Sequence, residues 1–214
     1  LSNIVNILKS SSLDGVVRDR SITMFEQLAV AEAKAHGSNI DDVHFHEVGA
    51  VDSILDIVGA AAGLEWLAAD EIVVAPMNTG GGTVKTQHGV IPVPGMATLN
   101  ILEAANAPIF SSTNEAELLT PTGALILVHA ATRFGSLPNM NVQASGYGAG
   151  SRDLRLPNVL RVVMGSTGSN GTTDVVSVIE TNLDDVTPEI VAYTLERLLS
   201  AGALDAYATA IQMK

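Results

Sequence analysis

Four stretches of the chain carry apolar residues at the three- and four-residue spacing of a helix that buries one face. These stretches are residues 1–9, 18–36, 96–105 and 188–199. Gly37 follows the second stretch and is its expected stop, because glycine readily takes the left-handed conformation that ends a helix. A further helix is expected over residues 122–132, behind the Thr-Pro pair at Thr120.

Short apolar runs between turn residues predict strands. They comprise residues 71–76, 108–110, 142–147 and 158–164, and a hairpin over residues 83–94. In the last pair of strands the glycine-rich residues 146–153 are expected to form the joint. Together these elements predict an α/β protein of mixed α+β type, in which an N-terminal mixed sheet is covered by helices.

Small polar residues between 166 and 173 predict a linker. It would separate a metal- and nucleotide-handling domain, residues 1–165, from residues 174–214. The second part shows strand, helix and strand patterns, which is the first half of a ferredoxin-like split βαβ domain. The apolar face of its helix would be partly open to water at roughly 25 cal/mol per Å². We therefore expect a homo-oligomer, or mobility of this part.

Composition narrows the classes of function. The 214 residues include no cysteine, so disulfides, thiolate zinc sites and thiol nucleophiles are excluded, and a cytoplasmic protein is favoured. The net charge of −12 argues against nucleic acid or an anionic membrane as the partner. A protein that handles cations fits this charge, and any metal must be held by nitrogen and oxygen ligands.

The densest group of candidate ligands follows residue 43. In an extended segment His44 and His46 would point to one face, and the helix expected after them carries Asp52 and Asp56 one turn apart. Val48, Val51, Leu55 and Val58 would be the buried stripe of that helix. Imidazole and carboxylate side chains in this pattern indicate a divalent metal site. The alternative is that the histidines are loop residues and the aspartates have backbone, Arg or Lys partners.

Two turns are candidates for binding an anion. The glycine-rich turn after residue 76 offers backbone N–H groups at Gly81, Gly82 and Thr83, although a tight turn alone would explain the pattern. Thr120 and Thr122 begin a helix whose free N–H groups could bind a phosphate, although helix capping is the commoner role of such residues.

Two further groups carry charge beside a turn or a helix start. Arg152 ends the glycine-rich joint and is an anion-binding side chain. Asp184, Asp185 and Glu189 precede or open the last helix. Three carboxylates suit Mg²⁺ or Mn²⁺ bound to the phosphates of a nucleotide, but an acidic helix start stabilised by the helix dipole is an equal interpretation.

Five sequence blocks occur in an order that resembles the LarC-type nickel insertion proteins. The blocks are residues 44–52, 82–89, 120–123, 146–150 and 180–185. The resemblance covers nearly the whole chain. It implies a cyclometallase, a lyase of the metal chelatase type, that inserts nickel into pyridinium-3,5-bisthiocarboxylic acid mononucleotide and hydrolyses CTP, with Mg or Mn, along the way. The product is the nickel-pincer cofactor of lactate racemase, so the racemase apoprotein is an expected partner.

Formation of a nickel–carbon bond requires loss of a ring proton, and His46, Glu47 and His88 are the candidate acceptors. The sequence does not rank these three residues. Segments expected at both ends of the family pattern are absent, so we interpret the chain as a fragment whose own activity is open. A nickel-binding chaperone or storage module is the alternative function, and it would leave the nucleotide-type loops unexplained.

Overall fold

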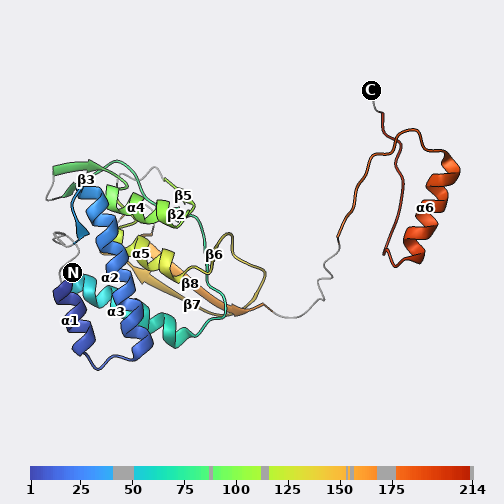
Figure 1. Cartoon of the computed structure of the whole chain (residues 1–214). Coiled ribbons are helices and arrows are strands. Elements are labelled where there is room, and N and C mark those ends of the chain that lie inside the picture. The colour runs from blue at the N-terminus through green and yellow to red at the C-terminus, as the bar shows by residue number, and fades with distance from the viewer. Residues whose placement is uncertain are drawn as a thin grey trace. The chain divides into compact units, whose positions relative to one another are not determined.

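The computed structural model combines helices with short strands, which confirms the mixed α and β class (Figure 1). It describes residues 1–40, 51–86, 89–111, 116–152, 154, 157–167 and 177–212. The chain divides into two compact units, Leu1–Gly168 and Ser169–Lys214. Each unit is described by itself.

The first unit is built around α2, which spans Gly15–His36. Asp14 caps its start by accepting a hydrogen bond from the backbone N–H of Val16 at 2.9 Å, so the helix begins three residues earlier than its apolar pattern predicts. It ends at Gly37, whose φ of 62° is left-handed, as expected. Before it lies α1, Ser2–Ser10.

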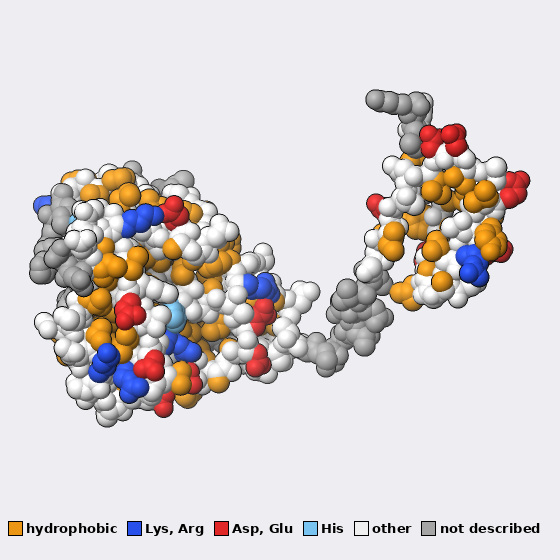
Figure 2. All heavy atoms as spheres, in the orientation of Figure 1, with side chains coloured by type: hydrophobic (Ala, Val, Ile, Leu, Met, Phe, Trp, Pro, Cys, Tyr) orange, Lys and Arg blue, Asp and Glu red, His pale blue; other side chains and the backbone are white. Residues whose placement is uncertain are grey.

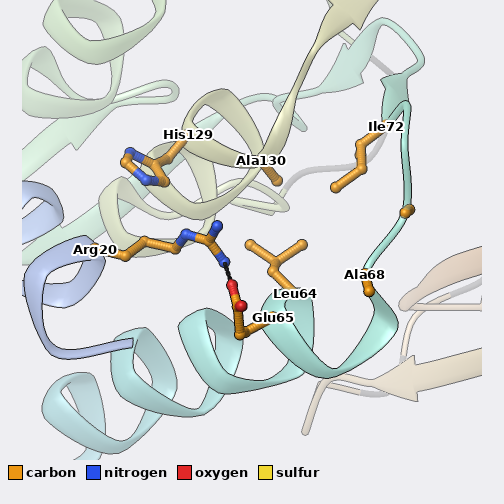
Figure 3. Close-up of a pocket in the computed structure, with 8 residues that line it drawn as sticks. Arg20, Leu64, Glu65, Ala68, Ile72, His129 and Ala130 are labelled. Atoms are coloured by element: carbon orange, nitrogen blue, oxygen red, sulfur yellow. Dashed lines mark ion pairs between the residues drawn. The ribbon is translucent and has the colours of Figure 1, made fainter. Parts of the chain in front are cut away.

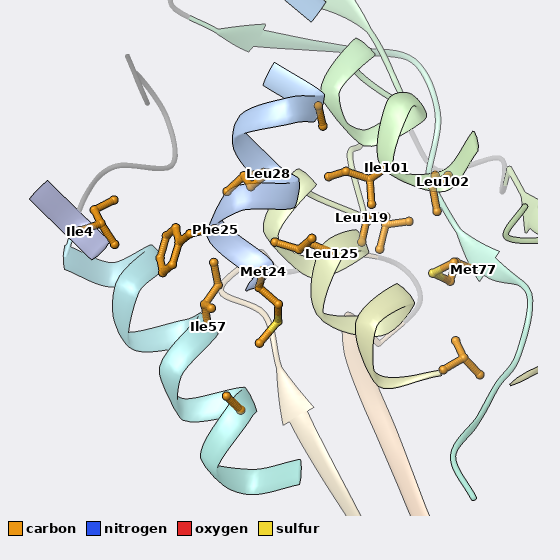
Figure 4. Packing of buried hydrophobic residues seen from close by; sticks show 14 of the residues in the cluster. Ile4, Met24, Phe25, Leu28, Ile57, Met77, Ile101, Leu102, Leu119 and Leu125 are labelled. Atoms are coloured by element: carbon orange, nitrogen blue, oxygen red, sulfur yellow. The ribbon is translucent and has the colours of Figure 1, made fainter. Parts of the chain in front are cut away.

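Buried side chains of α2 form the centre of the hydrophobic core (Figure 4). Phe25 and Leu28 are completely buried and pack with residues of α3, Val51–Leu67, and α5, Pro121–Ala130. The helix α4, Met96–Ala104, packs on both α2 and α5. The core therefore lies between helices rather than against one broad sheet.

The buried face of α3 differs from the predicted one. Val51 and Leu55 are 72% and 66% exposed, whereas Ile57 and Ala61 are completely buried. Of the other two predicted residues, Val58 packs partly buried against the core and Val48 lies outside the described residues. The prediction was wrong because apolar residues occupy most positions of this helix, so its sequence carries little phase information. Contact with α2 and α5 selects the face.

The strands of the described residues form four separate pairs instead of one sheet. Two pairs are parallel: β1, Val73–Val74, with β6, Arg133–Phe134, and β2, Met77–Asn78, with β5, Ile109–Phe110. The predicted hairpin is confirmed as an antiparallel pair of β3, Thr83–Thr86, and β4, Gly89–Pro92.

The fourth pair is a long antiparallel ribbon of β7, Asn141–Ala149, and β8, Val159–Ser166. β7 continues through residues that the sequence assigned to a flexible joint, since Gly146 pairs with Val162 and Gly148 with Leu160. That assignment was wrong because ladder hydrogen bonds to β8 hold these glycines in extended backbone.

In the second unit, the predicted helix is confirmed as α6, Pro188–Ser200. None of its residues is buried, and apolar side chains lie open on the surface of this unit (Figure 2). The strands predicted before and after this helix are wrong for the described residues, because residues 177–187 and 203–212 form no strand. A split βαβ arrangement has two parallel strands with a third strand between them. The described residues of this unit contain no strand at all. The ferredoxin-like half-domain stays a prediction.

Candidate functional site

A cavity of about 730 Å³ opens in the first unit where the ends of several elements meet. Its walls come from the end of α2, the start of α3, the β3–β4 hairpin and the starts of α4 and α5. A volume of this size suits a small-molecule ligand such as a mononucleotide. The polar lining residues are Glu32, His36, Asp52, Ser53, Asp56, Lys85, Thr86, Thr98, Glu117, Thr120 and Thr122.

One wall of this cavity is acidic. Asp52 and Asp56 lie one turn apart on α3 and both line the cavity, and both side chains are exposed. From α2 the wall receives Glu32 and His36, which approach each other to 3.5 Å between Oε2 and Nε2. Carboxylate and imidazole side chains of two helices are thus presented to one space, which is the kind of surface that attracts a divalent cation.

The predicted metal site is only partly described. Asp52 and Asp56 are in place, whereas His44 and His46 lie outside the described residues. Among the residues that the structure describes, no three His, Asp or Glu side chains are close enough together to hold a metal ion. The shared cation site of His44, His46 and Asp52 therefore stays a prediction. The candidate proton acceptors His46, Glu47 and His88 also lie outside the described residues.

Other residues of the lining supply hydrogen-bond donors and a cation. Lys85 on β3 lines the cavity and forms no ion pair with any described residue. Thr120 and Thr122 line the cavity at the start of α5. The hydroxyl of Thr120 accepts a hydrogen bond from the N–H of Gly123 at 3.2 Å. Thr120 therefore caps the helix, which is the commoner role of a threonine at this position.

The sequence interpretation missed the start of α4. Its N-cap is Gly95, which has no side chain to accept a hydrogen bond, and Thr98 in the first turn lines the cavity. Thr98 is completely buried, and its Oγ1 has no hydrogen-bond partner among the described residues. The signal in the sequence was a helix that begins behind Pro94 and Gly95 without a capping side chain.

Two backbone N–H groups of the glycine-rich turn are satisfied by the protein itself. The N–H of Gly80 donates to Asn78 Oδ1 and that of Gly81 to the carbonyl of Ala116, both at 3.1 Å. Residues Gly81, Gly82 and Thr83 do not line the cavity. A tight turn accounts for this segment, and its anion-binding role stays a prediction without support from these hydrogen bonds.

Arg152 is exposed in the turn after β7 and does not line the cavity. In the second unit, Asp184, Asp185 and Glu189 are exposed at the start of α6. Oδ1 of Asp184 accepts a hydrogen bond from the backbone N–H of Asp185 at 3.0 Å. Hydrogen bonds from its own backbone N–H and from Thr187 lower the pKa of Glu189 below its usual 4.5. These carboxylates thus interact with their own helix start, and they do not form a three-ligand metal group.

A smaller cavity of about 280 Å³ lies between α2, α3 and α5 (Figure 3). Arg20 from α2 crosses it, and its Nη1 is 3.5 Å from Glu65 Oε2 and 3.4 Å from the carbonyl of Ala61. His129 from α5 lines the same space. Burial is the larger cause that lowers the pKa of His129 below 6.5, and the positive charge of Arg20 lowers this pKa further. The ion pair of Arg20 and Glu65 thus joins α2 to α3 beside His129 of α5.

The chain belongs to the nickel insertion protein family, whose model matches residues 1–214. A nickel insertion protein of Geobacter metallireducens is 48% identical over 214 residues, which are 100% of this chain and 54% of the relative. A relative in Clostridium kluyveri is 45% identical over 214 residues, 100% of this chain and 53% of its own length. Its name is pyridinium-3,5-bisthiocarboxylic acid mononucleotide nickel insertion protein.

The chain spans about half the length of the curated relatives it matches. No solved structure matches it. Within the described residues, no helix is both long and apolar enough to cross a membrane.

Proposed function

We propose that this chain carries the part of a nickel insertion protein in which nickel and a pyridinium-3,5-bisthiocarboxylic acid mononucleotide meet. In the reaction, nickel as a substrate gains one bond to a ring carbon and bonds to the thiocarboxylate sulfurs, and the ring carbon loses a proton. The family membership and the name of the Clostridium kluyveri relative support this assignment.

The cavity of the first unit is the observation that carries the proposal. It has room for a mononucleotide and presents Asp52 and Asp56 on α3 together with Lys85 on the hairpin. A reaction between a cation and an anionic nucleotide needs groups of both charges in one space. The family resemblance supports His44 and His46 as further metal ligands, and His46, Glu47 or His88 as the proton acceptor.

The test uses the full-length protein with the variants Asp52→Asn and Asp56→Asn. Each variant removes one negative charge from the acidic wall without changing the size of the side chain. We expect lower nickel affinity by calorimetry and loss of the nickel-containing product by mass spectrometry. The matched control is Asp70→Asn, because Asp70 is an exposed aspartate that does not line the cavity. Wild-type product formation by both cavity variants would reject the proposed site.

CTP hydrolysis is proposed for the second unit, where Asp184 and Asp185, beside Glu189, would bind Mg or Mn together with the triphosphate of CTP. The resemblance and the exposure of these carboxylates support it. Replacing both Asp184 and Asp185 by Asn should abolish CTP hydrolysis in the full-length protein. Asp205→Asn is the control in the same unit, since Asp205 is exposed and lies beyond α6. Hydrolysis that is unchanged in the double variant would reject the assignment.

The alternative proposal is a nickel chaperone or store, because the acidic wall could hold the metal without any chemistry. Turnover that depends on CTP distinguishes the two functions, since a store would bind nickel but release no altered nucleotide. In either function the lactate racemase apoprotein is the expected recipient. A homo-oligomer is proposed as well, and the exposed apolar side chains of α6 support it.

A further inference from the structure

The start of α4 offers backbone donors to the main cavity. The first N–H groups of a helix, here those of Met96, Ala97 and Thr98, have no acceptor within the helix. A capping side chain normally satisfies one of them, but Gly95 has none. The N–H of Leu99 is the first that bonds back, to the carbonyl of Gly95 at 3.0 Å. All these residues line the cavity.

The hydroxyl of Thr98 is a second and independent sign of a ligand. It is completely buried, lines the cavity and lacks a partner among the described residues. A buried hydroxyl without a hydrogen bond is costly, and native proteins leave few of them unexplained. A bound group with acceptor oxygens would satisfy both the hydroxyl and the free N–H groups.

The start of α5 is different although it lines the same cavity. Pro121 has no N–H, and the hydroxyl of Thr120 already accepts from Gly123. The unsatisfied donors are thus concentrated at α4, and the hairpin adds Lys85, which forms no ion pair with any described residue. Helix N–H groups, a hydroxyl and an ammonium together form the kind of site that binds a phosphate.

We infer that the first turn of α4, with Thr98 and Lys85, binds the phosphate monoester of the mononucleotide. This inference rests on the proposed function and adds to it the orientation of the substrate. The phosphate end lies at α4, and the pyridinium end with its thiocarboxylates faces Asp52 and Asp56, where nickel arrives. A carboxylate wall would repel the phosphate, so the reverse orientation is unfavourable.

The test compares Thr98→Val with Thr98→Ser in the full-length protein. Valine keeps the shape of the side chain but removes the hydroxyl, whereas serine keeps the hydroxyl. We expect Thr98→Val to raise the Kd of the mononucleotide by about tenfold or more, as for loss of a hydrogen bond to a charged group. The Kd of the matching nucleoside, which lacks the phosphate, should not change. Thr98→Ser should bind the mononucleotide like the wild type.

A matched control is Thr79→Val. Thr79 is also buried, but its Oγ1 donates to the carbonyl of Phe110 at 3.2 Å and it does not line the cavity. The variant Thr79→Val should therefore have a lower Tm than the wild type and bind the mononucleotide as the wild type does. At position 98 the same substitution should weaken binding without lowering the Tm, because no hydrogen bond of the free protein is lost.

CTP also carries phosphates that this site could bind. Measuring the Kd of CTP in parallel shows whether the site binds the phosphate of the mononucleotide or a phosphate of CTP. CTP binding that is unchanged in Thr98→Val supports the inference, and weakened CTP binding with unchanged mononucleotide binding overturns it. Equal weakening of mononucleotide and nucleoside also overturns the placement of the phosphate, while the proposed function stands. If the wild type binds no mononucleotide at all, the proposed function itself fails, and the inference with it.

Discussion

Asn100 donates a hydrogen bond from Nδ2 to the backbone carbonyl of Ala31 at 3.0 Å, inside the contact between α4 and α2. Both residues are buried, and they are 69 positions apart in the chain. This bond fixes α4, whose first turn lines the main cavity, against α2, whose last turns carry Glu32 and His36. This bond therefore acts together with the apolar packing of the two helices to set the relative position of two cavity walls.

Replacing Asn100 by Ala should lower the free energy of unfolding by about 1–3 kcal/mol, because it removes a buried hydrogen bond and leaves a gap. Urea denaturation measures this change. Lys34→Met is the control, since Lys34 pairs with Glu103 between the same two helices but at the exposed surface. Exposed pairs contribute little, so the control should unfold like the wild type. Equal effects of both variants would contradict the role of Asn100.

Gly59→Ala should stabilise the protein by roughly 0.5–1 kcal/mol, because alanine costs less backbone entropy than glycine in a helix. Gly59 lies within α3, and a β-carbon built there has no atom within 4 Å. A higher urea midpoint checks the prediction, and a lower midpoint would indicate a neighbour that packs on Gly59.

Gly80→Ala should lower the free energy of unfolding. Its φ is 79°, and a β-carbon there would lie 1.9 Å from the carbonyl oxygen of Ala116. Gly37→Ala is the matched control, because Gly37 has a φ of 62° and open space around it. Gly37→Ala should cost about 1–2 kcal/mol for the left-handed conformation alone. Gly80→Ala should cost clearly more, and similar unfolding energies for the two variants would contradict the clash.

The stability of the first unit should depend on the protonation of His129. The pKa of His129 in the folded protein is below its usual value of 6.5. At pH values between the folded pKa and 6.5, the unfolded chain therefore binds more protons than the folded one. The free energy of unfolding should therefore fall as the pH decreases from about 6.5 through the folded pKa. Arg20, held near His129 and paired with Glu65, adds to this effect by opposing a second positive charge.

His129→Gln should remove this part of the pH dependence, because glutamine does not titrate. Urea titrations of wild type and variant between pH 5 and 8 measure the difference, and slopes shared with other groups cancel. The two stability curves should converge as the pH falls, since protonation then destabilises only the wild type. Curves that stay parallel over the whole range would contradict the lowered pKa.

Several elements could be predicted from the sequence because the determining interactions are local. The helix α2 shows this well: its apolar spacing from residue 18 and Gly37 after it act within a few residues of the backbone they influence. The cap Asp14, which sets its start at Gly15, was not recognised in the sequence. The β3–β4 hairpin and α6 follow local patterns too. Asp52 and Asp56 were correctly expected on one face because the helical repeat alone sets their relation.

Only the tertiary structure decided which face of α3 is buried and which residues share the cavity. In α3 apolar residues occupy most positions, so contact with α2 and α5 chose Ile57 over Val51. Thr98 became significant only when folding buried its hydroxyl beside residues from four other segments. Local propensity fixes the backbone of single elements, but a cavity is formed by side chains distant in sequence, and packing of whole elements determines where those side chains meet.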